Sequence, residues 1–154
     1  MANPFIRQVI ELAVANVGRD GGPFGALIVK DNVVIATGAN QVTRTNDPTA
    51  HAEVVAIREA CRILGDFQLS GCDLYASCEP CPMCFGAIFW ARPSRVFFAA
   101  THDDAAAAGF DDSLIYRQIS VPHAQRRIPM IHVVDELSDR PFAEWVNRPG
   151  KIEY

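Results

Sequence analysis

Two stretches decide the fold and the chemistry of this chain: Thr49-Ala50-His51-Ala52-Glu53 and Cys78-Glu79-Pro80-Cys81-Pro82-Met83-Cys84. They contain the patterns H-x-E and P-C-x-x-C. Imidazole and thiolate groups are common zinc ligands, and a catalytic zinc keeps three protein ligands and one open position. The sequence therefore predicts a zinc site, one ion per chain, whose ligands are His51, Cys81 and Cys84.

Glu53 follows the histidine closely enough to lie beside the same metal. A carboxylate next to an open zinc position can accept a proton from water and deliver it to a substrate. H-x-E followed by P-C-x-x-C is the signature of zinc-dependent nucleobase deaminases, in which the glutamate moves protons and is not a ligand. We therefore predict that Glu53 is catalytic.

Two other readings of the cysteines remain open. A C-x-x-C pattern alone also fits a structural zinc hairpin or a redox pair. A structural zinc needs a fourth cysteine or histidine. Cys78 begins the turn itself, and Cys61 and Cys72 have no paired spacing. A non-enzymatic zinc module would also have no use for Glu53. The catalytic reading accounts for more of the residues.

Size and charge restrict the class of protein. With 154 residues, 49% of them hydrophobic, the chain is expected to form a single domain over residues 1–154. A formal net charge of −4 provides no basic surface for a nucleic acid backbone. We therefore expect a small-molecule substrate and no nucleic acid partner.

Nothing in the sequence predicts a membrane segment or a secretory leader. Arg7 and Glu11 interrupt the first apolar stretch, and the uncharged run 80–91 is shorter than the roughly 20 residues that span a bilayer. Five cysteines, two of them required as thiolates, fit a reducing compartment. We therefore expect a cytoplasmic protein without membrane contact.

Strands and helices are expected to alternate along the chain. Apolar residues from Ile6 to Val17 recur at helical spacing, and Gly21-Gly22-Pro23 then marks a turn. The runs 24–30 and 33–38 are rich in β-formers, and the Asp31-Asn32 pair between them predicts a tight antiparallel hairpin. A strand over 73–77 and another over 95–101 follow.

Two helices are expected to begin at the metal ligands. One covers about 50–64, with Asp47 or Thr49 as its cap, and the other contains the stripe Cys84, Ala87, Ile88 and Ala91. The chain beyond residue 102 has weaker patterns, which predict short helices over 103–108, 114–119 and 141–147 and a last strand over 128–134. The elements together indicate an α/β fold.

With these residues in hand, the chain resembles the cytidine deaminase-like superfamily of zinc deaminases, and within it the small bacterial guanine deaminases. The H-A-E and P-C-P-M-C motifs are shared across the superfamily, whereas Gly109-Phe110-Asp111-Asp112 and the terminal Glu153-Tyr154 point to the guanine branch. The resemblance implies a three-layer α/β/α fold with a central five-stranded mixed sheet. It also implies a homodimer in which residues 148–154 form a lid or a domain-swapped tail.

The resemblance further implies the residues that contact the substrate. Asp112 would be a second catalytic carboxylate near the leaving amino group. The residues expected to bind a purine are Phe24, Asn40, Ala52, Trp90, Asp112 and Tyr154. The implied reaction is hydrolytic deamination of guanine to xanthine and ammonia.

Three related substrates stay open as alternatives: guanosine, a triazine amine, and adenosine in tRNA. The tRNA adenosine deaminases share both zinc motifs, but they need a basic surface, and the acidic balance of this chain argues against one. Cytidine deaminases tend to have cysteine in place of His51, which disfavours them.

Overall fold

The structure is a computed structural model that describes residues 3–154. It consists of two compact units, one of which ends at Ser113 while the other covers Leu114–Tyr154. The first unit contains every β-strand assigned in the described chain. It also contains the residues predicted to bind zinc.

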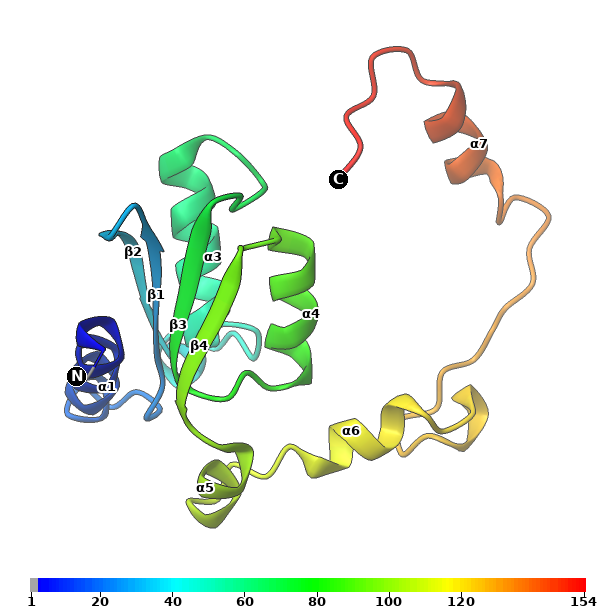
Figure 1. Cartoon of the computed structure of the whole chain (residues 1–154). Coiled ribbons are helices and arrows are strands. Elements are labelled where there is room, and N and C mark those ends of the chain that lie inside the picture. The colour runs from blue at the N-terminus through cyan, green and yellow to red at the C-terminus, as the bar shows by residue number, and fades with distance from the viewer. Residues whose placement is uncertain (1–2) are drawn as a thin grey trace. The chain divides into compact units, whose positions relative to one another are not determined.

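A four-stranded sheet with the order β2-β1-β3-β4 forms the centre of the first unit (Figure 1). The antiparallel pair β1 (Gly25–Lys30) and β2 (Val33–Ala39) is the predicted hairpin. Asp31 and Asn32 both have positive φ, at 50° and 62°, as a tight turn matched to the strand twist requires. β3 (Cys72–Cys78) lies antiparallel to β1 and parallel to β4 (Arg95–Ala100), so the sheet is mixed, as predicted.

Helix α1 (Pro4–Val17) covers one face of this sheet (Figure 1). The side chains of alternate strand residues point to opposite faces. On the α1 face, Val9 packs with Leu27, Val29 and Tyr75. The Asn3 side chain accepts from the first free N–H groups of the helix, which fixes where α1 begins.

Helices α3 (Ala52–Leu64) and α4 (Pro82–Ala91) cover the opposite face, which completes three layers in this unit (Figure 1). Ile28 and Leu74 are fully buried there against alanines of α3. Gly38 allows the close approach, because a Cβ at this position would lie 2.1 Å from the Ala52 carbonyl oxygen. The amino end of α3 is thereby fixed against β2.

The start of α3 differs from the prediction. His51 is the N-cap, with extended backbone, whereas Asp47 accepts from the Thr49 N–H and hydroxyl in a separate turn. A short helix α2 (Val42–Thr45), not predicted, precedes this turn because the polar segment closes one helical turn of its own. The predicted end of α3 is confirmed, with Gly65 in the left-handed conformation at φ 66°.

Beyond the sheet, α5 (His102–Ala107) begins at a capping box formed by Thr101 and Asp104. α6 (Ser113–Ile119), the 3₁₀ turn η1 (His123–Gln125) and α7 (Arg140–Asn147) follow. The three α-helices lie where the sequence predicted them. Among the described residues, no helix is both long enough and apolar enough to cross a bilayer.

The prediction of a fifth strand over 128–134 is wrong. No strand is assigned there, and the sheet of the described chain has four strands. The apolar residues of the segment are exposed, from Ile128 at 81% to Val134 at 83%. A run of β-formers becomes a strand only beside a partner strand, and none pairs with it among residues 3–154.

Candidate metal centre and active site

The three predicted ligands converge from two helix starts. His51 is the N-cap of α3, Cys81 is the N-cap of α4, and Cys84 lies in the first turn of α4. The His51 Nδ1 atom lies 3.5 Å from the sulfur of Cys81 and 3.5 Å from the sulfur of Cys84. One ligand atom from each of the three residues lies within 4.8 Å of the other two.

This geometry fits zinc. With Zn–S near 2.3 Å and Zn–N near 2.0 Å, tetrahedral ligands place nitrogen and sulfur about 3.5 Å apart. The observed nitrogen–sulfur distances match that value. Two sulfurs and one imidazole nitrogen are also the donors that zinc prefers, and they leave its fourth position open.

Hydrogen bonding between the two cysteines shifts their pKa values in opposite directions. The Cys84 thiol beside the Cys81 sulfur lowers the pKa of Cys81 to about 4, and His51 contributes in the same direction. The proximity of Cys81 and burial raise the pKa of Cys84, while the Cys81 sulfur raises the pKa of His51. A bound divalent cation would displace these protons, because it binds thiolate and neutral imidazole.

The starts of α3 and α4 add a favourable field. A helix amino terminus carries a partial positive charge, which stabilises a thiolate at its first residues. Neither N-cap residue accepts a hydrogen bond through its side chain from its own helix start. His51 and Cys81 therefore keep their side chains for the metal.

Glu53 lies beside the ligands without joining them. It is 8% exposed, and its Oε2 accepts from the Cys84 thiol at 3.4 Å. Burial raises the pKa of its carboxyl above the ordinary range. A carboxyl with a raised pKa binds a proton more readily than an ordinary one, which suits a group that accepts a proton and then delivers it.

Three of the predicted purine contacts lie next to the ends of strands or at the start of α3. Asn40 and Ala52 are buried, directly after β2 and at the first residue of α3. Phe24 precedes β1, and its ring forms a T-shaped pair with that of Phe110, with centroids 5.0 Å apart. Phe110 belongs to the stretch that also contains Asp112, so the aromatic pair joins two predicted parts of the site.

Asp112 is half-buried and lies near the metal ligands. Burial raises the pKa of its carboxyl, and the charge of Cys81 acts in the same direction. His102, which lies close enough to affect Asp112, lowers that pKa. The first unit thus contains two carboxyl groups with raised pKa values, Glu53 and Asp112.

Trp90 and Tyr154 lie in different parts of the chain. Trp90 is 64% exposed at the end of α4, which also exposes Phe85 and Phe89. Tyr154 is 70% exposed in the second unit, where its ring meets that of Trp145 at 6.3 Å between centroids. Their expected roles at the purine stay predictions.

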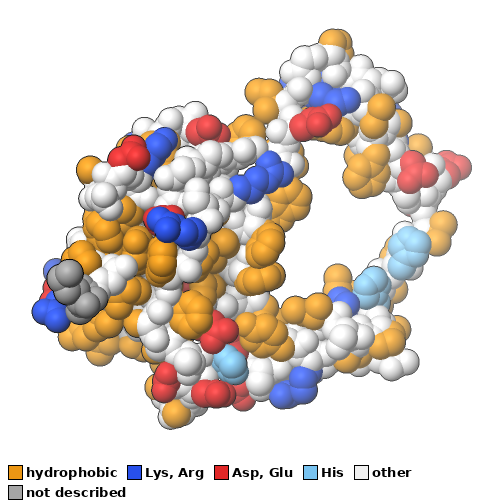
Figure 2. Space-filling view, in the orientation of Figure 1, with side chains coloured by type: hydrophobic (Ala, Val, Ile, Leu, Met, Phe, Trp, Pro, Cys, Tyr) orange, Lys and Arg blue, Asp and Glu red, His pale blue; other side chains and the backbone are white. Residues whose placement is uncertain are grey.

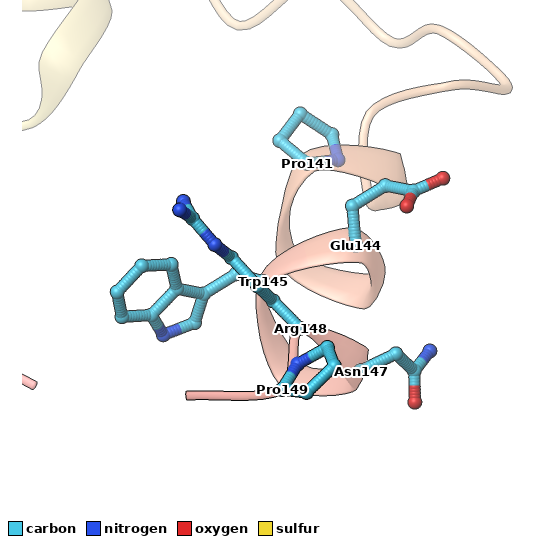
Figure 3. A pocket seen from close by; sticks show the side chains of 6 residues that line it. All are labelled: Pro141, Glu144, Trp145, Asn147, Arg148 and Pro149. Carbon is cyan, nitrogen blue, oxygen red and sulfur yellow. The ribbon is translucent and has the colours of Figure 1, made fainter. Parts of the chain in front are cut away.

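The second unit has hollows of its own. One, of about 480 Å³, lies along α7 between Pro141, Glu144, Trp145 and the residues after the helix (Figure 3). Another, of about 380 Å³, is lined almost wholly by apolar atoms of α6 and of residues 126–130. Neither hollow contains a cluster of three or more potential metal ligands. Among residues 3–154, such a cluster is found only at His51, Cys81 and Cys84.

Two contacts were not predicted from the sequence. Glu79, inside the second motif, accepts from the backbone N–H and the Nδ1 of His102 at 3.1 and 3.0 Å. Asn16 is buried and donates to the Asn40 carbonyl at 2.9 Å. A sequence signal for Asn16 did exist, because it extends the buried stripe of Val9 and Ala13 at helical spacing.

Comparisons with known proteins agree with this geometry. The family described as the cytidine and deoxycytidylate deaminase zinc-binding region matches residues 2–100. Guanine deaminase of Bacillus subtilis is 56% identical over 151 residues, which are 97% of each chain. The X-ray structure of guanine deaminase from Bacillus subtilis superposes with a TM-score of 0.97 at 55% identity, covering 99% of both chains.

A second group of relatives matches a smaller part of the chain. The tRNA-specific adenosine deaminase of Agrobacterium fabrum is 49% identical over 82 residues, 53% of this chain and 54% of that protein. The similarity to guanine deaminase, by contrast, continues through the second unit. The zinc-binding region, the ligand geometry and full-length similarity together show that the chain is a zinc-dependent enzyme of the cytidine and deoxycytidylate deaminase family.

Proposed function

We propose that this enzyme deaminates guanine hydrolytically, giving xanthine and ammonia. The observation that carries the proposal is the similarity to the Bacillus subtilis guanine deaminase over 97% of both chains, joined to a His-Cys-Cys-Glu site with suitable geometry. In the reaction a C–O bond forms at C2 of the purine, the C2–N bond breaks, and one water molecule is consumed.

His51, Cys81 and Cys84 would hold the zinc ion. When bound, zinc supplies a Lewis acid that polarises water and lowers its pKa to about 7. Glu53 accepts a proton from the attacking water and transfers it to the ring nitrogen beside C2. It then helps the amine to leave as ammonia. The raised pKa of its carboxyl supports both halves of this task.

Purine recognition is assigned to the residues around this centre. Phe24, in a T-shaped pair with Phe110, provides an apolar surface for a flat ring. Asn40 provides an amide for the purine edge, and Ala52 a small wall beside the ligands. Asp112, whose pKa is raised, is placed as a second carboxyl near the leaving amine.

We assign Trp90 and Tyr154 to the purine on the resemblance alone. Trp90 would line the pocket, and Tyr154 would close it as part of a lid. Both side chains are exposed in the structure.

A homodimer is the proposed assembly. The second unit contains no buried residue in the described chain, while Ile128, Ile131, Val133, Val134 and Phe142 are at least 70% exposed. Figure 2 shows hydrophobic side chains at the surface of the molecule. Exposed apolar side chains gathered in a unit without buried residues indicate an interaction surface. A partner copy that covers this unit, with exchange of the tail, would bury it.

A cytoplasmic location accords with the zinc thiolates and with five cysteines that form no disulfide. A reducing compartment keeps Cys81 and Cys84 available for the metal.

Ammonia release from a purine panel tests the function, with zinc content measured on the same sample. The panel contains guanine, guanosine, a triazine amine, adenine and a tRNA anticodon stem-loop. We expect release from guanine at a rate well above that of the others. Release from the stem-loop alone would assign the chain to the tRNA branch.

A further inference from the structure

Asn16 is a buried polar residue near the end of α1. It is 4% exposed, and its Nδ2 donates to two backbone carbonyls, that of Gly22 at 2.8 Å and that of Asn40 at 2.9 Å. One carbonyl belongs to the turn before β1 and the other directly follows β2. Because an unpaired buried amide is costly, these two bonds hold the Asn16 side chain in one orientation.

Two glycines let the turn close around this amide. A Cβ at Gly21 would lie 2.3 Å from the Asn16 Nδ2, and a Cβ at Gly22 would lie 3.0 Å from the Asn40 Cγ. The Gly21 N–H also donates to the Asn16 carbonyl at 3.0 Å. The Gly-Gly pair is therefore needed for the close approach of the turn to Asn16 and Asn40.

The hydrogen bonds around Asn16 continue to two of the residues assigned to the purine, Phe24 and Asn40. The Phe24 N–H donates to the Gly22 carbonyl at 2.8 Å, and the Asn40 N–H donates to the Phe24 carbonyl at 3.1 Å. The Asn40 Oδ1 accepts from the Val42 N–H at 3.2 Å, which sets the amide plane. Its Nδ2 makes no hydrogen bond to the described part of the chain and is left as a donor.

We propose that Asn16 is a positioning residue, which orients Asn40 and Phe24 for the purine through the Asn40 and Gly22 carbonyls. The inference rests on the proposed function, since that function assigns the two residues to the substrate. A planar ring that is bound by one amide and one aromatic face reaches the attacking geometry only if both groups have fixed positions relative to the zinc ligands. Asn16 holds Asn40 and Phe24 in these positions without touching the substrate.

Asn16→Asp tests the proposal, because it keeps the size of the side chain and removes both donated hydrogen bonds. We expect kcat/KM for guanine to fall on the order of 10- to 10²-fold, mainly through KM, with zinc content unchanged. Asn16→Ser, smaller and still a donor, serves if the aspartate variant does not fold. Asn3→Ala is the matched control, because it removes the cap at the other end of α1.

A double variant separates positioning from stability. If Asn16 acts through Asn40, Asn16→Asp in an Asn40→Ala background should lower kcat/KM little further. Additive losses, or an equal loss in Asn3→Ala, would overturn the proposal.

Should the wild type release no ammonia from guanine, the proposed function fails. A ligand-free crystal structure of Asn16→Asp then decides: a displaced Asn40 amide supports positioning, and an unmoved one overturns it.

Discussion

At the scale of single residues, the chemistry depends on the distances between three ligand atoms, one imidazole nitrogen and two sulfurs. His51 and Cys81 are N-caps, a position with extended backbone, so their side chains leave the helix starts toward each other. The Nδ1 atom of His51 lies 3.5 Å from both sulfurs, close to the spacing that tetrahedral zinc requires. Little reorganisation is needed when the ion binds.

The ligand assignment predicts which cysteines matter for zinc. His51→Ala, Cys81→Ala and Cys84→Ala should each lower the zinc content well below one ion per chain, because each removes one of three protein ligands. Cys61→Ala and Cys72→Ala should retain it, since both lie outside the ligand group. Elemental analysis of the purified variants checks this. Full zinc in Cys84→Ala would refute the assignment.

Glu53→Gln should keep the zinc and the fold but lose at least on the order of 10²-fold in kcat for guanine. The amide has nearly the same size as the carboxyl but cannot carry a proton. Zinc content and melting temperature serve as controls, measured on the same preparation. Near-normal turnover would mean that another residue, such as Asp112, moves the proton.

At the scale of elements, the metal-ligand turn is tied to the start of α5. Glu79 accepts from the backbone and the imidazole of His102, and His102 also lies 3.4 Å from Asp103. Hydrogen bonding to Glu79 raises the pKa of His102, and the same contact lowers the pKa of Glu79. The pair thus links the cysteine turn to the stretch that leads to Asp112.

These shifts predict how the stability of the link depends on pH. The His102 contribution is complete below its ordinary pKa of 6.5 and is lost as pH rises through the raised folded value. The Glu79 contribution is present above 4.5 and is lost as pH falls through the lowered value. The melting-temperature deficit of His102→Gln relative to wild type should therefore be larger at pH 5.5 than at pH 8.5. An equal deficit at both would contradict a charged pair.

An element can be predicted from the sequence when the residues that determine it lie close together along the chain. The hairpin followed from Asp31-Asn32, and the helices α3 and α4 followed from apolar stripes, because turn and helix patterns act over a few residues. The fifth strand failed because pairing depends on a distant partner. The role of Asn16 was missed because its acceptors, Gly22 and Asn40, are remote in sequence or lie in an irregular turn.

At the scale of the whole molecule, the two units differ in how they bury apolar side chains. The first has clusters on both faces of its sheet, whereas the second leaves most of its apolar residues exposed. A unit without its own core depends on further contacts for stability. The proposed dimer gives the segment 128–134 a place to be buried.

Charges placed on that segment should break the dimer. Ile131→Asp with Val133→Asp should convert the enzyme to a monomer, because burying two carboxylates in an apolar interface is costly. Val14→Asp is the matched control: Val14 is 67% exposed on α1, so the same change should leave the assembly intact. Analytical ultracentrifugation reports the mass. A dimer that persists in the double variant would place the interface elsewhere.

Deleting residues 149–154 tests the proposed lid. None of these residues belongs to the two hydrophobic clusters of the sheet. The deletion removes the ring contact between Tyr154 and Trp145 and the hydrogen bond that the Lys151 amine donates to the Val146 carbonyl. The melting temperature and zinc content should therefore change little. Turnover of guanine should fall, because an open pocket admits water and no longer holds the purine in the geometry for attack.

The same deletion should also change substrate choice. A lid that crowds the sugar-bearing edge of the purine excludes nucleosides, so its removal should raise the rate on guanosine relative to guanine. Tyr154→Ala is the finer variant, because it keeps the length of the tail and the Lys151 contact while removing the ring. Equal guanine turnover in full-length, truncated and Tyr154→Ala proteins would leave the tail without a catalytic role, whereas a matching loss in both variants assigns closure to the tyrosine.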